Sequence, residues 1–350
     1  MTRLLDDIRR EPAQISRALN FTLDSGRTAL RAAADAVRDA PHTLVVGIGA
    51  SWNAALAIHV AWNALGRPAH LFDASELLHF SEVPPDSCVI LLSRSGKSVE
   101  IVRLIAKCRA RQAKIVAITN APESPLARQS DIVLPLNLEF DHSVSVSMYS
   151  ALAATANLLV HESEGTLVPE TVAGVNSSLG QAASAIPTWL QQIEESDWLQ
   201  PAAPTCFLAR GLSLASSYEA ALLWEEAAKS PASAMSTGSF RHGPQEIVRP
   251  GLRIGIWIDP EKMRDEDLAL AGDLRTHGAK VLLIGQRLPA DSADLQLNIP
   301  TIPGGWQFLS DIIPIQLAAE RLAALSGENC DAFRLCPYVI EGEAGLPGAG

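Results

Sequence analysis

The sequence predicts an α/β protein built from two tandem, doubly wound parallel-sheet lobes. Short apolar runs that suit buried strands alternate with stretches of helical periodicity along most of the chain, which is typical of parallel sheets with crossover helices. The apolar runs also repeat. Four start at residues 43, 89, 114 and 132, and four more start in the same order at residues 205, 254, 280 and 295. The separation between matching starts is nearly constant, which indicates an internal duplication.

These runs place the elements along the chain. The expected strands cover residues 43–46, 89–92, 114–118 and 132–134 in lobe one, and residues 205–208, 254–258, 280–284 and 295–297 in lobe two. Apolar stripes before and between the lobes predict helices. The expected organisation is a helical lead-in at 1–40, lobe one at 41–170, a helical linker at 171–197, lobe two at 198–340 and a flexible tail at 341–350.

Composition narrows the class of protein. The 350 residues are 47% hydrophobic and 19% charged, as in ordinary globular chains, and the net charge of −11 argues against nucleic-acid binding. The five cysteines show no close-paired metal spacing, so reduced thiols and no bound metal are expected. The charged N-terminus does not resemble a signal peptide, and no apolar run is long enough to span a membrane. A cytoplasmic protein that binds a small molecule is the expectation.

The most informative segment is Ser93-Arg94-Ser95-Gly96-Lys97-Ser98, which lies between an expected strand and an expected helix. The first N–H groups of a helix have no internal partner, and the helix dipole adds partial positive charge there. Serine hydroxyls add further donors. Ser93, Ser95 and Ser98 with Arg94 therefore suit a phosphate monoester, and the alternative is an ordinary capped βα loop.

A second turn follows the first strand of lobe one. Gly47 and Gly49 begin a glycine-rich dinucleotide fingerprint, and Asp73 lies at a suitable distance, but Trp52 occupies the place of the third glycine. A bulky side chain there obstructs the helix–strand packing that the fingerprint needs. A nicotinamide cofactor is therefore disfavoured. Gly49, Ala50 and Ser51 are interpreted instead as a second turn that cradles the same ligand as the serine segment.

The stretch Asp141–Ser147 follows the last strand of lobe one, with serines alternating as on a strand. It is either a solvated edge or part of a ligand site, because open α/β sheets bind ligands at the carboxyl ends of their strands. On the second interpretation Val144 and Ser145 line the ligand.

Lobe two differs in its chemistry. In place of the serine segment it has the acidic turn Asp259-Pro260-Glu261-Lys262, which would repel a phosphate. Its helix 218–228 carries Glu219 and Glu226 on one face with two leucines. A half-desolvated carboxylate is a common general base, and the alternative is a solvated glutamate at a helix edge.

His242 is the second chemical candidate in lobe two. It precedes Gly243-Pro244, which is typical of a helix start. The positive end of a helix favours a neutral imidazole, which can exchange a proton with a sugar oxygen.

These motifs resemble the sugar isomerase (SIS) family of flavodoxin-like lobes, and in particular the two-lobed isomerase half of glucosamine-6-phosphate synthase and its deaminase and deglycase relatives. The matching motifs are Gly49-Ala50-Ser51, the serine segment, the helix from Glu219 to Glu226, and Arg241-His242-Gly243-Pro244. The resemblance implies that Ser51, Ser93, Ser95 and Ser98 hold a sugar phosphate and that residues around Val144 line the sugar. It further implies that Glu226 moves a proton between adjacent sugar carbons. His242 would assist ring opening from the partner subunit of a homodimer, and no metal or organic cofactor is implied.

Two departures from the family pattern affect the expected chemistry. Leu223 replaces the lysine of the catalytic helix, and Tyr338 or Pro337 stands where the synthase has a lysine that forms a Schiff base. Neither side chain can act as an amine nucleophile. Arg94 also replaces the glutamine of the family's serine loop.

The expected function follows from these matches and departures. We expect a phosphosugar isomerase or deaminase without a glutaminase domain, acting on an amino-sugar phosphate or a fructosamine phosphate through an enediol or enolamine. The alternatives are a synthase-like aldose–ketose isomerase and a non-catalytic sugar-phosphate sensor, for which Glu226 would be unnecessary.

Overall fold

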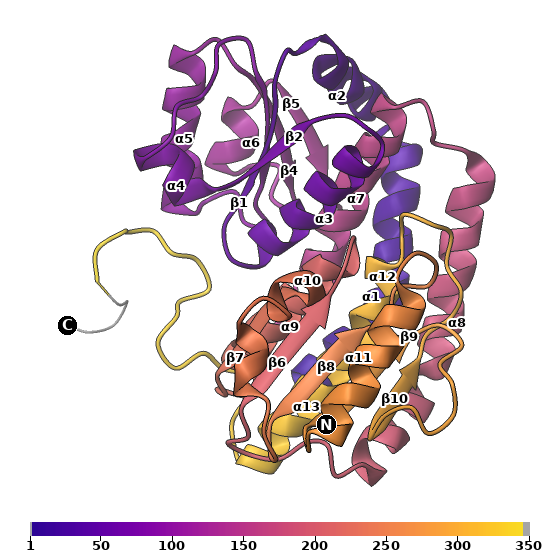
Figure 1. Ribbon diagram of the computed structural model, residues 1–350. Helices are drawn as coiled ribbons and strands as arrows, with labels where there is room; N and C mark the ends of the chain where they lie inside the picture. The colour runs from indigo at the N-terminus through magenta and orange to yellow at the C-terminus, as the bar shows by residue number, and fades with distance from the viewer. Residues whose placement is uncertain (1, 346–350) are drawn as a thin grey trace. The chain divides into compact units, whose positions relative to one another are not determined.

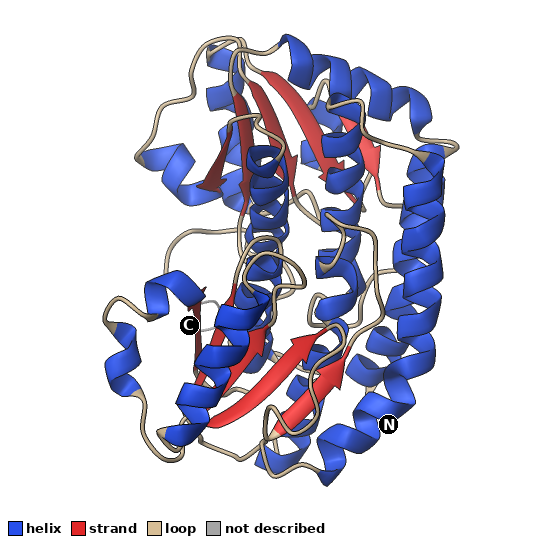
Figure 2. Cartoon of the chain, turned by 45° about the vertical axis from the view of Figure 1, so that its right-hand side comes forward, coloured by secondary structure: helices blue, strands red, loops and turns tan. Residues whose placement is uncertain are grey.

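The computed structural model describes residues 2–345 and contains two parallel sheets of five strands each (Figures 1 and 2). The strand orders are β2-β1-β3-β4-β5 and β10-β9-β8-β6-β7. The first sheet consists of β1 (Thr43–Gly47), β2 (Ala69–Asp73), β3 (Cys88–Leu92), β4 (Lys114–Thr119) and β5 (Ile132–Pro135). The second consists of β6 (Thr205–Ala209), β7 (Ala232–Ser236), β8 (Arg253–Trp257), β9 (Lys280–Gly285) and β10 (Leu295–Asn298). The predicted two-lobed α/β fold is confirmed.

In the part of the chain that the structure describes, helices connect successive strands except β9 and β10, which are joined by a loop. In the first half they are α1 (Arg3–Leu23), α2 (Arg27–Asp39), α3 (Ala50–Ala64), α4 (Ala74–His79), α5 (Val99–Ala110), α6 (Pro125–Gln129) and α7 (Ser147–Ser163). The second half contains α8 (Pro169–Glu195), α9 (Ser213–Glu226), α10 (Thr237–Phe240), the 3₁₀ turn η1 (Pro244–Ile247), α11 (Arg264–Thr276), α12 (Phe308–Asp311) and α13 (Ile313–Ser326). Within the described residues, none of these helices has the length and apolar character needed to span a membrane.

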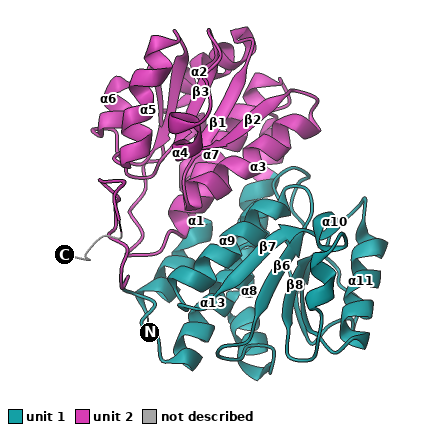
Figure 3. Cartoon of the chain, turned by 60° about the vertical axis from the view of Figure 1, so that its left-hand side comes forward, with its two compact units in different colours: residues 1–12, 174–332 teal, residues 13–173, 333–350 magenta. Residues whose placement is uncertain are grey.

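The chain forms two compact units (Figure 3). We call the unit of residues 13–173 with the C-terminal segment from residue 333 lobe one, and the unit of residues 174–332 with the segment up to residue 12 lobe two. Helices α1 and α8 each run from one unit into the other. Of the predicted flexible tail, residues 346–350 lie outside the described residues, while Glu343 bonds to His79 and Arg103 in lobe one.

Each lobe has a fifth strand that the sequence analysis missed, and both lie at a sheet edge. β2 pairs with β1, and β7 pairs with β6, in parallel. Both strands are mostly half-buried or exposed, and β7 consists only of alanine, serine and methionine. They therefore lack the continuous apolar run that marks a strand buried on both faces. Because each directly neighbours the first strand of its lobe, the internal repeat extends to all five strands.

The central strands are buried on both faces because helices cover both sides of each sheet. In lobe one, Leu44, Val46, Val89 and Leu91 pack in one cluster with residues of α4, α5 and α6. The alternate residues of the same strands, such as Val45, point to the other face and are also fully buried. This doubly wound arrangement brings the carboxyl ends of the strands, and the loops that follow them, to one edge of each sheet.

Candidate active site

The turn after β1 depends on two glycines. A Cβ on Gly47 would lie 2.3 Å from the carbonyl oxygen of Ser51, so a side chain cannot fit between the strand and α3. Gly49 precedes α3 with φ of 57° and ψ of −134°, a conformation that strongly favours glycine. Ala50 and Ser51 form the half-buried start of the helix. The predicted tight turn is present, and it places Ser51 at the carboxyl end of β1.

The serine segment follows β3 and forms a compact loop. Ser93 and Ser95 are buried, and their hydroxyl oxygens accept hydrogen bonds from the N–H groups of Gly96 (3.1 Å) and Lys97 (3.3 Å). Ser98 is the N-cap residue of α5, but its hydroxyl makes no capping bond. The loop is therefore shaped by its own serines, and the start of α5 lies directly behind it.

Gly96 is required where the loop approaches the next turn of lobe one. Its φ is 61°, and a Cβ there would lie 2.1 Å from the hydroxyl oxygen of Ser124. The carbonyl oxygen of Gly96 accepts a hydrogen bond from the N–H of Leu126. The serine loop is thus held against α6 by a contact that only glycine permits.

The two turns meet at one place in the sheet. β1 and β3 are neighbouring parallel strands, so the turns after them lie side by side at the carboxyl edge. The chain runs from β1 outward to β2 on one side and continues with β3 on the other. The strand order reverses at this point, which is where doubly wound sheets bind ligands.

The stretch Asp141–Ser147 joins this edge, but its conformation differs from the expected one. It is a loop that leads into α7 and not a strand, and Ser143, Val144 and Ser145 are buried, so it is not a solvated edge. The Asp141 carboxylate accepts hydrogen bonds from the N–H groups of Val146, Ser147 and Met148. This carboxylate satisfies the free donors at the start of α7, which is a structural task.

The arrangement of lobe one disfavours a nicotinamide cofactor a second time. The Asp73 carboxylate, which would bind the ribose of a dinucleotide, accepts hydrogen bonds from the N–H groups of Ser75 (2.8 Å) and Glu76 (3.3 Å). It therefore serves as the N-cap of α4.

In lobe two, Glu226 is the last residue of α9 and is half-buried. Glu219 and Leu223 on the same helix are buried at 1% exposure each. Glu225 is exposed, and its carboxylate accepts a hydrogen bond from the N–H of Ala232 at the start of β7. Partial burial raises the pKa of Glu225. This hydrogen bond shows that α9 ends beside the amino end of β7.

His242 lies at the opposite end of the same strand. The chain runs along the five residues of β7, through α10, and reaches an exposed His242. At about 3.3 Å per residue, β7 alone separates the two ends by about 16 Å. One chain therefore does not bring Glu226 and His242 together. The helix predicted after His242 is also wrong in length, because Pro244–Ile247 forms a single 3₁₀ turn with little dipole.

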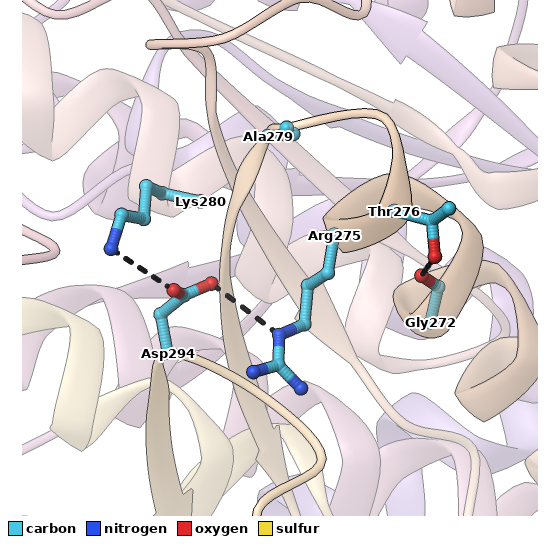
Figure 4. A pocket seen from close by; sticks show the side chains of 7 residues that line it. Gly272, Arg275, Thr276, Ala279, Lys280 and Asp294 are labelled. Carbon is cyan, nitrogen blue, oxygen red and sulfur yellow. Dashed lines mark hydrogen bonds and ion pairs between the residues drawn. The ribbon is translucent and has the colours of Figure 1, made fainter.

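Lobe two also carries a surface pocket near the start of β9, and Figure 4 shows its charged lining. Lys280 and Arg275 both pair with Asp294, whose carboxylate also accepts the N–H of Val281. Lobe one repeats this arrangement with Lys114 and Arg109 on Asp131, which accepts the N–H of Ile115. Because both lobes carry it at the amino ends of their strands, we interpret it as a structural clamp.

The sequence analysis missed two polar features of the described residues. The side chain of Arg94 bonds to residues of the loop at 143 and the C-terminal segment at 338, which lie far away in sequence. Asp311 is buried, and its carboxylate accepts hydrogen bonds from the hydroxyls of Ser213 (2.6 Å) and Ser216 (2.5 Å). Burial raises the pKa of Asp311 to about 7. Neither feature has a local sequence signal.

The two-lobed fold and the serine loop can now be compared with known proteins. Residues 36–160 match the SIS domain family. The match covers most of lobe one, and the resemblance predicted from the motifs is confirmed.

Similar proteins extend the likeness to the whole chain. The glutamine–fructose-6-phosphate aminotransferase [isomerizing] of Sulfolobus acidocaldarius is 25% identical over 291 residues, which cover 83% of this chain and 48% of that protein. The chain thus spans about half the length of this relative. The C-terminal domain of the Francisella tularensis glucosamine-fructose-6-phosphate aminotransferase has the same fold, with a TM-score of 0.83, 20% identity and coverage of 95% of this chain and 98% of that one. A glucosamine-6-phosphate deaminase structure from Thermotoga maritima gives a TM-score of 0.81 at 21% identity, with coverage of 97% and 99%.

Proposed function

We propose that this protein is an enzyme that acts on a phosphorylated amino sugar or a fructosamine phosphate, and that it either isomerises this substrate or releases its amine. One observation carries the proposal: the serine loop after β3 lies beside the Gly49 turn, where the strand order of lobe one reverses. Serine hydroxyls and the positive end of the α5 dipole suit a phosphate dianion. The names of the similar proteins, which refer to hexose phosphates and amine transfer or removal, support this substrate class.

In this proposal the phosphate group of the substrate supplies binding energy. Ser51, Ser93, Ser95 and Ser98 hold it, and the Gly49–Ala50 turn allows the sugar to approach the backbone closely. Val144 and Ser145 line the sugar chain. Binding energy from the phosphate, which does not react, then orients the carbon that loses its proton.

The proposed reaction moves one proton between neighbouring carbons. His242 passes a proton to the ring oxygen as the ring opens. The Glu226 carboxylate removes the C2 proton of the open-chain amino aldose, which leaves an enolamine, and returns a proton to C1. The resulting C2 imine is hydrolysed by water, so that ammonia leaves and a ketose phosphate remains. A fructosamine phosphate would undergo the proton transfer in the opposite direction before its amine is released. Acid–base chemistry of this kind needs only a positioned carboxylate and imidazole.

Release of an amine is favoured over amine transfer from glutamine by two residues. Leu223 lies buried in α9, and Tyr338 stands near the C-terminus, where the resembling synthase has lysines. Neither can form a Schiff base with a ketose. An aldose–ketose isomerase remains the second candidate because the similar curated proteins carry "isomerizing" in their names. It needs the same base and the same phosphate site.

We further propose a homodimer with shared active sites. The supporting geometry is the placement of Glu226 and His242 at opposite ends of β7. Because one chain keeps them apart, the base and the ring-opening group for one substrate would come from different subunits.

A substrate screen tests the chemistry. Amino-sugar phosphates and fructosamine phosphates are incubated with the protein, and ammonia, free amine and ketose phosphate are measured. Amine release with a ketose or aldose phosphate as co-product supports the proposal. Isomerisation without amine release would establish the second candidate. Phosphosugar binding with no turnover of any substrate would indicate a sensor.

Subunit mixing tests the sharing of sites. Glu226→Gln and His242→Ala chains are each expected to be inactive alone, and mixed dimers are expected to regain part of the activity by pairing intact halves. Mass spectrometry verifies the exchange of subunits. Verified exchange without recovery would contradict shared sites.

A further inference from the structure

The C-terminal segment of lobe one, residues 338–343, lies across the serine loop, and we call it the strap. The carbonyl oxygen of Ile340 accepts a hydrogen bond of 3.1 Å from the N–H of Val99. Val99 is the first residue of α5, so this N–H has no partner within the helix. Further along, Glu343 pairs with Arg103 of α5 and with His79 of α4. The strap therefore contacts the helix whose start forms the back of the loop.

Arg94, within the loop itself, makes the central contact. Its guanidinium carbon lies 3.9 Å from the centre of the Tyr338 ring, and its Nη2 donates to the Tyr338 carbonyl oxygen at 2.9 Å. The other terminal nitrogen, Nη1, donates to the carbonyl oxygen of Ser143 at 3.3 Å. One side chain thus connects the serine loop, the buried loop before α7 and the strap.

The geometry of this contact bears on what Arg94 does. An arginine that binds phosphate directly presents its planar fork of N–H groups to the anion. Here both terminal nitrogens are bonded to carbonyl groups, and the tyrosine ring covers one face of the guanidinium. The terminal nitrogens of Arg94 already bond to protein carbonyls, so the serine hydroxyls and the positive end of α5 are the groups that we assign to the phosphate.

The two residues that meet here are both departures from the family pattern. Arg94 stands at the glutamine position of the serine loop, and Tyr338 stands at or beside the position of the C-terminal lysine. Because the two replacements contact each other, they form one structural unit.

We propose that Arg94 is a positioning residue that fastens the strap to the serine loop and so preorganises the loop for phosphate, without binding the phosphate itself. The identity of the ligand rests on the proposed function, but the fastening does not. Loss of the Arg94–Tyr338 contact would release the strap, expose the start of α5 to water and weaken phosphate binding indirectly.

Hydrogen exchange at the Val99 amide tests the fastening directly, because its hydrogen bond to Ile340 reports whether the strap is docked. The full-length protein is compared with Arg94→Gln, Arg94→Lys and Tyr338→Ala, and Tyr338→Phe serves as the control that keeps the ring. Exchange at Val99 is expected to rise about tenfold or more in the two Arg94 variants, which lose the cation–π contact and a charged hydrogen bond. In Tyr338→Ala the backbone carbonyl that accepts from Arg94 remains, so a rise of about two- to fivefold is expected from the lost ring contact. Tyr338→Phe loses only the 3.5 Å hydrogen bond from its hydroxyl to the Asp141 carbonyl oxygen and is expected to leave the exchange nearly unchanged. Unchanged exchange in both Arg94 variants would overturn the fastening.

Phosphate affinity separates positioning from direct binding. Glucosamine 6-phosphate is titrated in a Glu226→Gln background, in which turnover is expected to be slow enough for binding to be measured. Arg94→Lys and Arg94→Gln are expected to weaken binding to the same extent, because lysine keeps the charge but loses the planar fork and the stack. If lysine preserves the affinity and glutamine does not, Arg94 binds the phosphate and the proposal is wrong. Released exchange at Val99 with unchanged affinity would also overturn the positioning role. A parent protein that binds no phosphosugar would refute the proposed function while the exchange result still decides the fastening.

Discussion

The two lobes repeat one fold but build the turn after the third strand of the repeat in opposite ways. In lobe one this turn follows β3 and begins with Ser93, whose hydroxyl accepts the N–H of Gly96. In lobe two the corresponding turn follows β8 and contains Asp259. The Asp259 carboxylate accepts the N–H groups of Glu261, Lys262 and Met263.

The difference explains why one lobe suits an anion and the other does not. A serine hydroxyl can still donate to a ligand while it accepts from its own loop. A carboxylate is an acceptor only, and it fills the turn with negative charge. Lobe two therefore satisfies its loop donors with a carboxylate, in the turn where the serine hydroxyls of lobe one still carry protons to donate.

The two lobes also differ in the residue that directly follows the first strand of each. Ile48 directly follows β1 and packs against the cluster that contains Ile101, near the start of α5. In lobe two, Arg210 directly follows β6 and forms a hydrogen-bonded ion pair of 2.8 Å with Asp267, in the first turn of α11. Asp267 is fully buried, and burial raises its pKa despite the neighbouring arginine. An apolar contact at the ligand edge of lobe one is thus matched by a polar one in lobe two.

The largest expected effect concerns the chemistry that we assign to lobe two alone. Glu226→Gln keeps the shape of the side chain but removes the proton acceptor, so kcat is expected to fall by about 10²–10⁴-fold while substrate binding survives. Steady-state kinetics measures both. Glu225→Gln is the matched control, since its amide oxygen can still accept from Ala232. If Glu226→Gln keeps most of its rate, Glu226 is not the base, and Glu219 becomes the next candidate.

Exchanging Ser93 and Asp259, the residues that distinguish the two turns, tests whether they cause the difference between the lobes. Ser93→Asp places a carboxylate like that of lobe two beside the phosphate site, and repulsion between like charges is expected to raise KM by more than about tenfold. The reciprocal Asp259→Ser change is expected to leave KM unchanged and to weaken the hydrogen bonds of its turn, at a cost of about 1 kcal/mol in unfolding experiments. Equal effects on KM from both changes would mean that the lobes share the binding task.

Asp311 provides a pH-dependent difference between the lobes. It belongs to α12, which follows β10 as α7 follows β5, and the first turn of α7 carries no acidic residue. Burial raises the pKa of Asp311 to about 7 in the folded state, whereas the unfolded chain ionises near 3.8. The unfolded state therefore binds fewer protons between these values, and this residue lowers stability as pH rises from about 4 to 7, by up to about 1.4 kcal/mol per pH unit.

Urea unfolding at several pH values measures this effect. The parent is expected to lose stability relative to Asp311→Asn as pH rises from 5 to 7, and the difference between them is expected to level off above about pH 8. Asparagine keeps an acceptor for one serine hydroxyl. Parallel pH profiles for the two proteins would show that Asp311 is ionised in the fold throughout this range.

The smallest expected effect concerns the clamp that the lobes share. Lys114→Ala removes one partially exposed ion pair, and Lys280→Ala removes two, to Asp294 and Asp197. Each lost pair is expected to cost at most about 1 kcal/mol of stability. Neither is expected to change substrate KM. A selective rise in KM for Lys280→Ala would show that the pocket of Figure 4 binds a ligand, contrary to our structural interpretation.

Much of the fold could be predicted from the sequence because its signals are local. Four strands of each lobe were found from short apolar runs, which are continuous except in β10, and the serine loop lies between one such run and a periodic helix. The edge strands β2 and β7 were missed because one side of each is open to solvent and neither needs an apolar run. Asp141–Ser147 was mistaken for a possible strand because alternating serines mimic a period of two, although the Asp141 carboxylate organises the segment as a helix start.

Only part of the candidate site could be predicted from the sequence, and the reason differs from that for the fold. Residue types and spacing indicated Ser95 and Glu226, but spacing along a chain does not show which end of a strand a residue reaches. The separation of Glu226 from His242 follows from the parallel direction of β7. The contact between Arg94 and Tyr338 joins residues 244 positions apart, and the strap has no periodic pattern that would have marked it.

The central claim is that the serine loop of lobe one is the phosphate site of this chain. Calorimetric titration of Glu226→Gln protein with glucosamine 6-phosphate and with glucosamine tests it most directly. We predict one phosphosugar per chain and much weaker binding of the unphosphorylated sugar. Adding Ser95→Ala is expected to reduce phosphosugar affinity by about tenfold or more, as for the loss of one donor to a charged group. Equal affinity for the two sugars, or no loss on Ser95→Ala, would contradict the claim.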